Sequence, residues 1–240
     1  EKEFIGMLLA NKVLQQVTDC LSCPWQQRME NLKVVVLGAP KVGKTSLIQR
    51  FLTNEYSEQY STTKDKSCYL PTILFNDQMF HIKLIDLPPI ASFPANTLIE
   101  WSDYRFYGLR SASAYIMVFD LSRLESFHYV RILRQQILET RDMQNVPIVV
   151  VGSKSDLIRT KELSHERRLY RDIVNTIRKN WKTTYTECSA KYNWHIVSVF
   201  RELVRSLHSS PESIVKDNVR ASQQNIVERR RRNRDTCAIL

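Results

Sequence analysis

Residues 38–45 read Gly38-Ala39-Pro40-Lys41-Val42-Gly43-Lys44-Thr45 and lie between the apolar run 32–37 and the helical pattern 46–52. This spacing is G-x-x-x-x-G-K-[ST] in a meaningful context, a buried strand that turns through glycines into a helix. The backbone N–H groups of such a loop point at one spot, where they can hold a triphosphate. Lys44 adds a charge over the outer phosphates, and the Thr45 hydroxyl can ligate the Mg²⁺ that bridges them. The stretch therefore predicts a nucleotide site.

The chain is long enough for one globular domain, since it has 240 residues of which 43% are hydrophobic. It contains no apolar run long enough to predict a membrane-spanning helix. It begins at Glu1, and Met29 would be a natural start, so the status of residues 1–28 stays open. The five cysteines have irregular spacing, which indicates reduced thiols in a cytosolic protein. Cys20 and Cys23 are interpreted as ordinary thiols rather than half of a zinc site.

The formal net charge of +10 lies mostly in the body of the chain. Residues 1–30 contribute −1 and residues 211–240 contribute +3, so +8 remains, notably over residues 159–182. A basic body is typical of proteins that face nucleic acid or an anionic membrane. No base-reading module is present in the sequence, so we expect no nucleic acid and favour a membrane surface.

Short apolar runs alternate with helical patterns. Strands are predicted at 32–37, 68–75, 80–86, 114–120, 147–152 and 185–188. Helices are predicted at 44–52, 122–140, 164–180 and 195–207, with Ser122 as the N-cap of the second. This alternation predicts an α/β fold with a mostly parallel six-stranded sheet and helices on both faces. We expect a folded domain over residues 31–210, an extension at 1–30 and a flexible tail at 211–240.

Further polar groups follow the predicted strands. Asp86 closes the strand 80–86, where it can hold the metal through water. Asp156 follows the strand 147–152, and its carboxylate can accept two N–H bonds from a guanine edge but would repel adenine. The Lys154 stem can cover the base plane. The backbone of Ser189-Ala190-Lys191 offers N–H groups to the guanine carbonyl.

Together these motifs resemble the Ras superfamily of small GTP-binding proteins over residues 31–210. The sequence is similar to the atypical Ras-like family ten branch in its segments LIDLPPI (84–90), QQILETR (135–141) and ECSAKYNWH (187–195). The resemblance implies a P-loop G domain, GTP or GDP with Mg²⁺, and a signalling switch with effector and regulator proteins. It also implies that Tyr56 borders the guanine ring, Tyr60 caps the phosphates and Thr63 ligates the metal. Thr62 competes for this last role, because the usual preceding proline is missing.

The predicted site combines the phosphate loop, the metal ligands and the base pocket. The expected GTP contacts are Gly38, Ala39, Pro40, Lys41, Val42, Gly43, Lys44, Thr45, Ser46, Tyr56, Thr63, Asp86, Ser153, Lys154, Asp156, Ser189, Ala190 and Lys191. The expected Mg²⁺ ligands are Thr45, Thr63 and Asp86.

Several residues depart from the family pattern where it carries the chemistry. Asp-x-x-Gly is replaced by Asp86-Leu87-Pro88-Pro89, and Pro89 has no N–H to donate to the γ-phosphate. Ile90 stands where the family places the glutamine that orients the attacking water. Pro40 removes one donor from the phosphate loop, and Ser153 shortens a side chain that braces the base site. No catalytic residue is therefore assigned, and we expect weak or absent intrinsic GTP hydrolysis.

The segment after Asp86, called switch II, is long and contains Phe93 and Trp101. These aromatic side chains either pack over the sheet edge or form a partner-binding surface. The sequence leaves both alternatives open.

The last residues carry a basic run and a lipidation signal. Arg229-Arg230-Arg231-Arg232-Asn233-Arg234 precedes Cys237-Ala238-Ile239-Leu240, and the final leucine favours geranylgeranylation of Cys237. One lipid with a polybasic patch gives stable membrane binding. The expected location is therefore the cytoplasmic face of the plasma membrane or of an endomembrane. A nuclear-localisation or RNA-binding patch would explain the arginines but not Cys237.

Three functions remain open on these grounds. The first is a membrane-anchored guanine-nucleotide switch with slow hydrolysis. The second is a pseudo-GTPase scaffold with a vestigial or permanently occupied site, favoured by Pro40, Pro89, Ile90 and Ser153. The third is a basic nucleic-acid-binding protein, which requires the arginines to act without the lipid.

Overall fold

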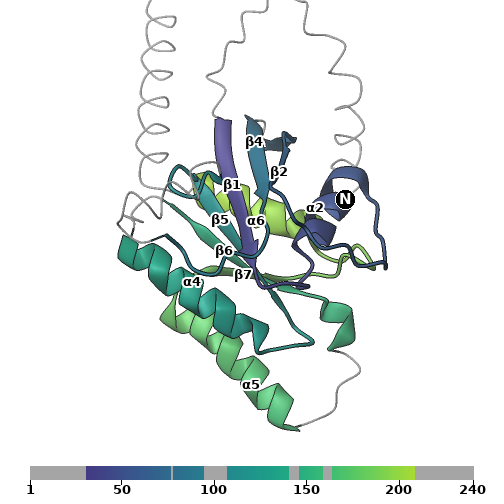
Figure 1. Cartoon of the computed structure of the whole chain (residues 1–240), viewed down its shortest axis with the longest axis vertical. Coiled ribbons are helices and arrows are strands. Elements are labelled where there is room, and N and C mark those ends of the chain that lie inside the picture. Colours follow the sequence, from purple (N-terminus) through teal and green to yellow (C-terminus); the bar gives the residue numbers. More distant parts are fainter. Residues whose placement is uncertain (1–30, 77, 95–106, 141–145, 159–163, 209–240) are drawn as a thin grey trace, which may run out of the picture.

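The computed structural model describes residues 31–76, 78–94, 107–140, 146–158 and 164–208 (Figure 1). Its strands are β1 (Asn31–Gly38), β2 (Ser67–Tyr69), β3 (Thr72–Phe75), β4 (Gln78–Asp86), β5 (Ala114–Asp120), β6 (Ile148–Ser153) and β7 (Thr184–Glu187). Its helical elements are α2 (Lys44–Thr53), α4 (Ser126–Thr140), η2 (Ser155–Leu157), α5 (Ser164–Asn175), η3 (Thr176–Asn180) and α6 (Ile196–His208). The extension 1–30, Trp101 and the tail 211–240 with Cys237 lie outside the described residues.

One sheet contains all of these strands, in the order β2-β4-β1-β5-β6-β7, with β3 also paired to β4. The strands β4, β1, β5, β6 and β7 are parallel to one another, whereas β2 and β3 run antiparallel to β4. The prediction of an α/β fold with a mostly parallel sheet is confirmed.

The sheet has seven strands where six were expected, because one predicted strand is interrupted. Ser67 of β2 pairs with Asp86 of β4, and Thr72 of β3 pairs with His81 of β4. The two short strands therefore follow a single register along β4. Pro71 lies between them and has no N–H with which to complete the ladder. Its carbonyl accepts a bond from the Ile82 N–H at 2.9 Å. The two short strands therefore occupy the place of one.

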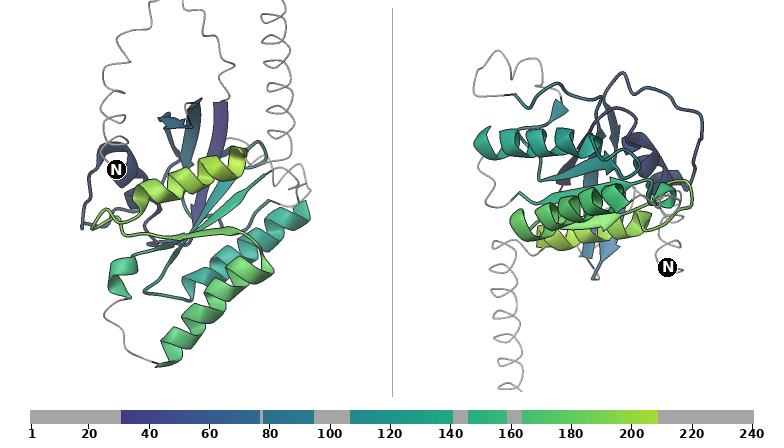
Figure 2. Two further views of the ribbon diagram at one scale, coloured as in Figure 1. Left: turned by 180° about the vertical axis from the view of Figure 1, so that it is seen from behind. Right: turned by 90° about the horizontal axis from the view of Figure 1, so that it is seen from below.

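Alternating strand residues build a core on each face of the sheet. In β1, Val34 and Val36 belong to the core that α2 and α6 cover, and Val35 and Leu37 to the core that α4 and α5 cover. Every residue of the central strand β5 is buried. The helices thus lie on both faces, as the sequence predicted (Figures 1 and 2).

This arrangement gathers the ends of the parallel strands at one edge. β1 ends at Gly38, β4 at Asp86, β5 at Asp120 and β6 at Ser153. In open α/β sheets, ligands bind in the crevice outside these carboxyl ends. The residues predicted to bind nucleotide follow these positions along the chain.

One predicted helix boundary is wrong. α4 begins at Ser126 rather than Ser122, because the N–H and O–H of Ser122 both bind Asp120 Oδ1, at 2.8 and 2.6 Å, and close a turn. The helix predicted at 164–180 is confirmed over that range, as α5 followed directly by the π-helical turn η3, which ends at Asn180. Within the described parts of the chain, no helix is long and apolar enough to cross a bilayer.

Candidate functional site

Lys44 lies at the start of α2 and binds back onto the phosphate loop. Its Nζ donates to the carbonyls of Gly38 at 2.9 Å and Ala39 at 3.2 Å. The preceding Gly43 has a φ of 90°, in the left-handed region that glycine adopts without strain. Burial lowers the pKa of Lys44 to about 8, against the opposing effect of the Asp86 charge. The amine is therefore still mostly protonated at pH 7 and is held at the loop where the motif requires a cation.

The other carbonyls of the loop accept bonds from side chains of the neighbouring strand ends. The donors are Arg123 Nη2 to Pro40 O at 3.2 Å, Lys154 Nζ to Lys41 O at 2.9 Å and Ser153 Oγ to Val42 O at 2.6 Å. The N–H and C=O of a trans peptide point in opposite directions, so the loop N–H groups of these peptides face away from the donors. The loop is thus braced on its carbonyl side.

The three predicted metal ligands meet at the start of α2. Thr45 Oγ1 donates to Asp86 Oδ2 at 2.5 Å and lies 2.8 Å from Thr63 Oγ1. Of the two candidate threonines, it is Thr63 rather than Thr62 whose hydroxyl contacts Thr45. Burial raises the pKa of Asp86, while the bond from Thr45 and the charge of Lys44 oppose the shift.

The chemistry of this corner fits a magnesium ion. Asp86 Oδ1 is buried and has no hydrogen-bond partner among the described residues. A buried polar atom without a partner is costly, and a metal-bound water would supply the missing donor. Two hydroxyls and a carboxylate are hard oxygen donors of the kind that Mg²⁺ prefers. Elsewhere in the described residues, no three histidine, cysteine or acidic side chains cluster as a metal site.

Ser153 still braces the phosphate loop although it is shorter than the family's asparagine. Its Oγ lies 2.6 Å from Val42 O and 2.9 Å from Phe119 O, and its single proton serves one of these acceptors at a time. Asp156 follows in η2 and is half-buried. The predicted base motif therefore keeps its contact with the loop.

The loop that carries Ser189, Ala190 and Lys191 is tied to α2. Arg50 of α2 donates through Nε to Ala190 O at 2.6 Å and through Nη2 to Lys191 O at 2.8 Å. The Ser155 N–H of η2 donates to the carbonyl of Cys188 at 3.1 Å. The two parts of the predicted base pocket are thus joined by the backbone.

Tyr56 and Tyr60 both lie in the segment 54–66 between α2 and β2, called switch I. The guanidinium group of Arg50 lies over the Tyr56 ring, with 5.8 Å between its carbon and the ring centroid. Tyr60 lies against the phosphate loop, where Lys41 Nζ is 5.3 Å from its ring centroid. Tyr56 is 37% exposed and Tyr60 is 53% exposed.

The start of switch II packs against α4. Ile90 is 3% exposed, its N–H donates to Tyr129 Oη at 3.1 Å, and the Tyr129 hydroxyl donates to its carbonyl at 2.6 Å. Phe93 is also 3% exposed, and its N–H donates to Gln136 Oε1 at 2.9 Å. Of the two alternatives for Phe93, the partner-binding surface is wrong, because the ring lies in the core.

Three further residues beside the phosphate loop and the base pocket were not predicted from the sequence: Asp120, Arg123 and Arg50. Arg123 and Arg50 bind loop carbonyls, and Asp120 binds Arg123 and Lys154. A signal for Asp120 was present, since it closes an apolar strand run as Asp86 does. The arginines gave no such signal, because their partners are backbone atoms from distant segments.

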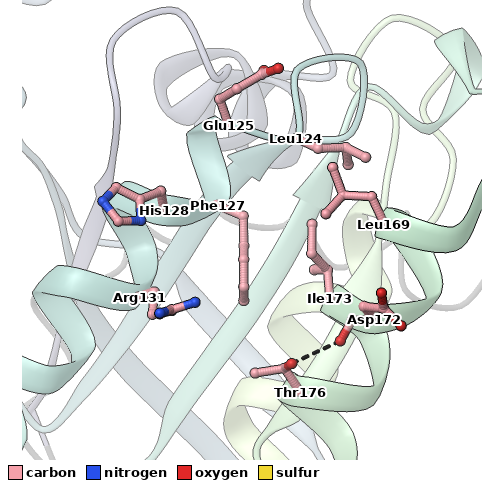
Figure 3. A pocket seen from close by; sticks show the side chains of 9 residues that line it. All are labelled: Leu124, Glu125, Phe127, His128, Arg131, Leu169, Asp172, Ile173 and Thr176. Atoms are coloured by element: carbon pink, nitrogen blue, oxygen red, sulfur yellow. Dashed lines mark hydrogen bonds between the residues drawn. The ribbon is translucent and has the colours of Figure 1, made fainter. Parts of the chain in front are cut away.

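A pocket of about 290 Å³ lies away from this site, between α4 and α5 (Figure 3). Phe127 and Ile173 contribute to its apolar part, while Arg131 and Asp172 contribute charges of opposite sign. None of the predicted nucleotide contacts lines it.

Comparisons of the sequence with known proteins show its family. The Ras family model matches residues 33–209. Human Ras-like protein family member 10B is 45% identical over 177 residues, covering 73% of this chain and 85% of that protein. Mouse Ras-like protein family member 10A is 38% identical over 179 residues, with the same shares covered. Mouse GTP-binding protein Rit1 is 28% identical over 183 residues, covering 76% of this chain and 77% of that protein. The chain therefore belongs to the Ras family of small GTPases.

Proposed function

We propose that this protein is a guanine-nucleotide switch that binds GTP and GDP with Mg²⁺ and hydrolyses GTP slowly. The observation that carries the proposal is the meeting of Thr45, Thr63 and Asp86 beside Lys44. Thr45 and Thr63 would hold the ion directly and Asp86 through water. When bound, Mg²⁺ would neutralise part of the phosphate charge.

Each part of the site has a role in this proposal. The phosphate-loop N–H groups and Lys44 bind the phosphates, and Tyr60 covers them. Asp156 selects guanine, since its carboxylate accepts two N–H bonds that adenine does not offer. The stem of Lys154 and the ring of Tyr56 border the base, and the loop 189–191 donates to the guanine carbonyl.

Slow hydrolysis follows from the start of switch II. Attack on the γ-phosphate requires a positioned water and donors for the spreading charge. Ile90 has no polar side-chain atom, and its burial against α4 together with both bonds to Tyr129 holds it away from solvent. Pro89 has no N–H. Loss of one well-placed donor typically costs about 3 kcal/mol, roughly a hundredfold in rate.

Titration calorimetry tests nucleotide binding directly. Nucleotide-free protein should bind GTP and GDP in the presence of Mg²⁺, bind them weakly after EDTA, and show no heat with ATP. Lys44→Asn should abolish tight binding, whereas Lys83→Asn, at an exposed lysine of β4, should not change it. A wild-type protein that gives no heat with GTP would refute the switch and favour the scaffold alternative.

The scaffold alternative has one structural observation in its favour. The switch II segment is bonded to α4 through Tyr129 and Gln136, which favours a surface that does not respond to nucleotide. The nucleotide content of freshly purified protein, read by chromatography, discriminates the two. A switch carries exchangeable GDP or GTP, a vestigial site carries none, and a permanently occupied site carries nucleotide that does not exchange.

We further propose an organisation around a membrane anchor. The domain over residues 31–210 would follow the extension 1–30 and precede a tail at 211–240 that ends in a prenylated Cys237. The arginines at 229–234 would add on the order of 1 kcal/mol each at an anionic surface. The proposed location is the cytoplasmic face of the plasma membrane or of an endomembrane, where effector and regulator proteins would meet the domain.

A further inference from the structure

A buried carboxylate outside the predicted nucleotide contacts joins two cations beside the phosphate loop. Asp120 ends β5 and is 0% exposed. Its Oδ2 accepts bonds from Lys154 Nζ at 2.8 Å and Arg123 Nε at 3.4 Å, and its Oδ1 accepts two bonds from Ser122. Burial alone would raise the pKa of Asp120, but the bonds from Lys154 and Ser122 hold it below its usual value. The carboxylate is therefore ionised at neutral pH and pairs with both cations.

The same two cations hold the peptide groups on either side of Lys41. Arg123 Nη2 donates to Pro40 O at 3.2 Å, and Lys154 Nζ donates to Lys41 O at 2.9 Å. Lys41 has a φ of 64°, in the left-handed region that residues with a Cβ adopt at a cost. Fixing both flanking carbonyls maintains this conformation. It also fixes the N–H groups of Lys41 and Val42, which belong to the same two peptides and point the opposite way.

We propose that Asp120 and Arg123 are positioning residues of the nucleotide site. The Asp120 bridge, formed by Asp120, Arg123 and Lys154, orients the phosphate-loop N–H groups and slows the release of bound nucleotide. Pro40 increases the importance of the bridge, because a loop with one donor fewer depends more on the orientation of the others. This inference rests on the proposed function, since it concerns how long bound nucleotide stays.

The test is the rate at which fluorescent GDP leaves the full chain in Mg²⁺ when unlabelled GDP is added in excess. Arg123→Gln should release GDP roughly three- to tenfold faster than wild type, as expected for the loss of hydrogen bonds at a half-exposed guanidinium. Arg131→Gln is the matched control, because it removes the same charge from an exposed position on α4 outside the bridge. It should release GDP at the wild-type rate.

Two further variants separate positioning from a general loss of stability. Arg123→Lys keeps the charge but replaces the separate Nε and Nη2 donors with a single amine, so its release rate should be intermediate. Asp120→Asn removes the charge that holds both cations and should release GDP faster than Arg123→Gln. The double variant Asp120→Asn with Arg123→Gln should release GDP at nearly the same rate as Asp120→Asn alone. The thermal midpoint of the nucleotide-free protein should be the same for Arg123→Gln and Arg131→Gln.

Each outcome bears on the inference. Equal release from Arg123→Gln and wild type overturns it, and leaves the proposed function intact because the wild type has bound GDP. A wild type that retains no GDP overturns both. If Asp120→Asn does not fold, the Arg123 variants decide alone, since that side chain is 50% exposed and lies outside the core.

Discussion

Raising the pH from 7 to 9 should stabilise the nucleotide-free protein through Lys44. Burial lowers the pKa of this amine from 10.5 to about 8. Between these values the native state has released the proton and the unfolded state still holds it, so stability rises with pH. From pH 7 to pH 9 the free energy of unfolding should rise by roughly 1.4 kcal/mol from this group.

A second buried group, Cys188, has the opposite effect on stability as the pH rises, so its contribution must be separated from that of Lys44. Burial raises the pKa of Cys188 from 9.0 to about 12, so the unfolded thiol ionises first and stability falls above pH 9. Lys44→Met keeps Cys188 and removes only the amine. The difference in unfolding free energy between wild type and Lys44→Met therefore isolates Lys44.

The assay is urea unfolding of both proteins at pH 7, 8 and 9 after removal of nucleotide with EDTA. Lys83→Met, at an exposed lysine of β4, keeps Lys44 and should retain the wild-type pH dependence. If the difference in unfolding free energy between wild type and Lys44→Met stays constant from pH 7 to pH 9, Lys44 does not have the lowered pKa. The same linkage predicts that GDP affinity falls as the pH rises above 8, because bound phosphates favour the protonated amine.

Three other outcomes are expected. Asp156→Asn should weaken GDP binding about ten- to hundredfold while leaving the fold intact, because the carboxylate no longer accepts two hydrogen bonds from the base. Calorimetry with GDP measures the affinity and circular dichroism checks the fold; an unchanged affinity contradicts the prediction. Gly38→Ala should destabilise the protein by about 2 kcal/mol, because the new Cβ would lie 2.3 Å from the Val118 carbonyl oxygen; a wild-type urea midpoint argues against that clash. Cys237→Ser should move the protein from membranes to the soluble fraction of eukaryotic cells, and mass spectrometry that finds wild-type Cys237 unmodified rules the anchor out.

The phosphate loop and two of the three expected metal ligands, Thr45 and Asp86, could be predicted because short stretches of sequence identify them. Lys44 and Thr45 belong to one motif, and Asp86 ends an apolar run, which places a carboxylate at the carboxyl edge of the sheet. The choice between Thr62 and Thr63 required the fold, because switch I has no regular element to set its register.

Other features depended on contacts between distant segments. Ser122 has the residue type of an N-cap, but Asp120 takes both of its donors and α4 starts one turn later. Whether Phe93 faces solvent or the core could not be predicted, because the core residues it packs with come from distant segments of the chain. Pro71 did carry a readable signal, since a residue without an N–H breaks an antiparallel ladder.

Single-turnover hydrolysis of bound GTP distinguishes a slow guanine-nucleotide switch from an ordinary one. The protein is loaded with GTP in EDTA, Mg²⁺ is added, and the bound GTP and GDP are followed by chromatography, beside an ordinary Ras-type protein. We expect GTP to stay bound and to be hydrolysed roughly a hundredfold more slowly than in the reference. Pro89→Gly with Ile90→Gln should speed the reaction. Hydrolysis by the wild-type protein at the reference rate, or loss of GTP without hydrolysis, would contradict these expectations.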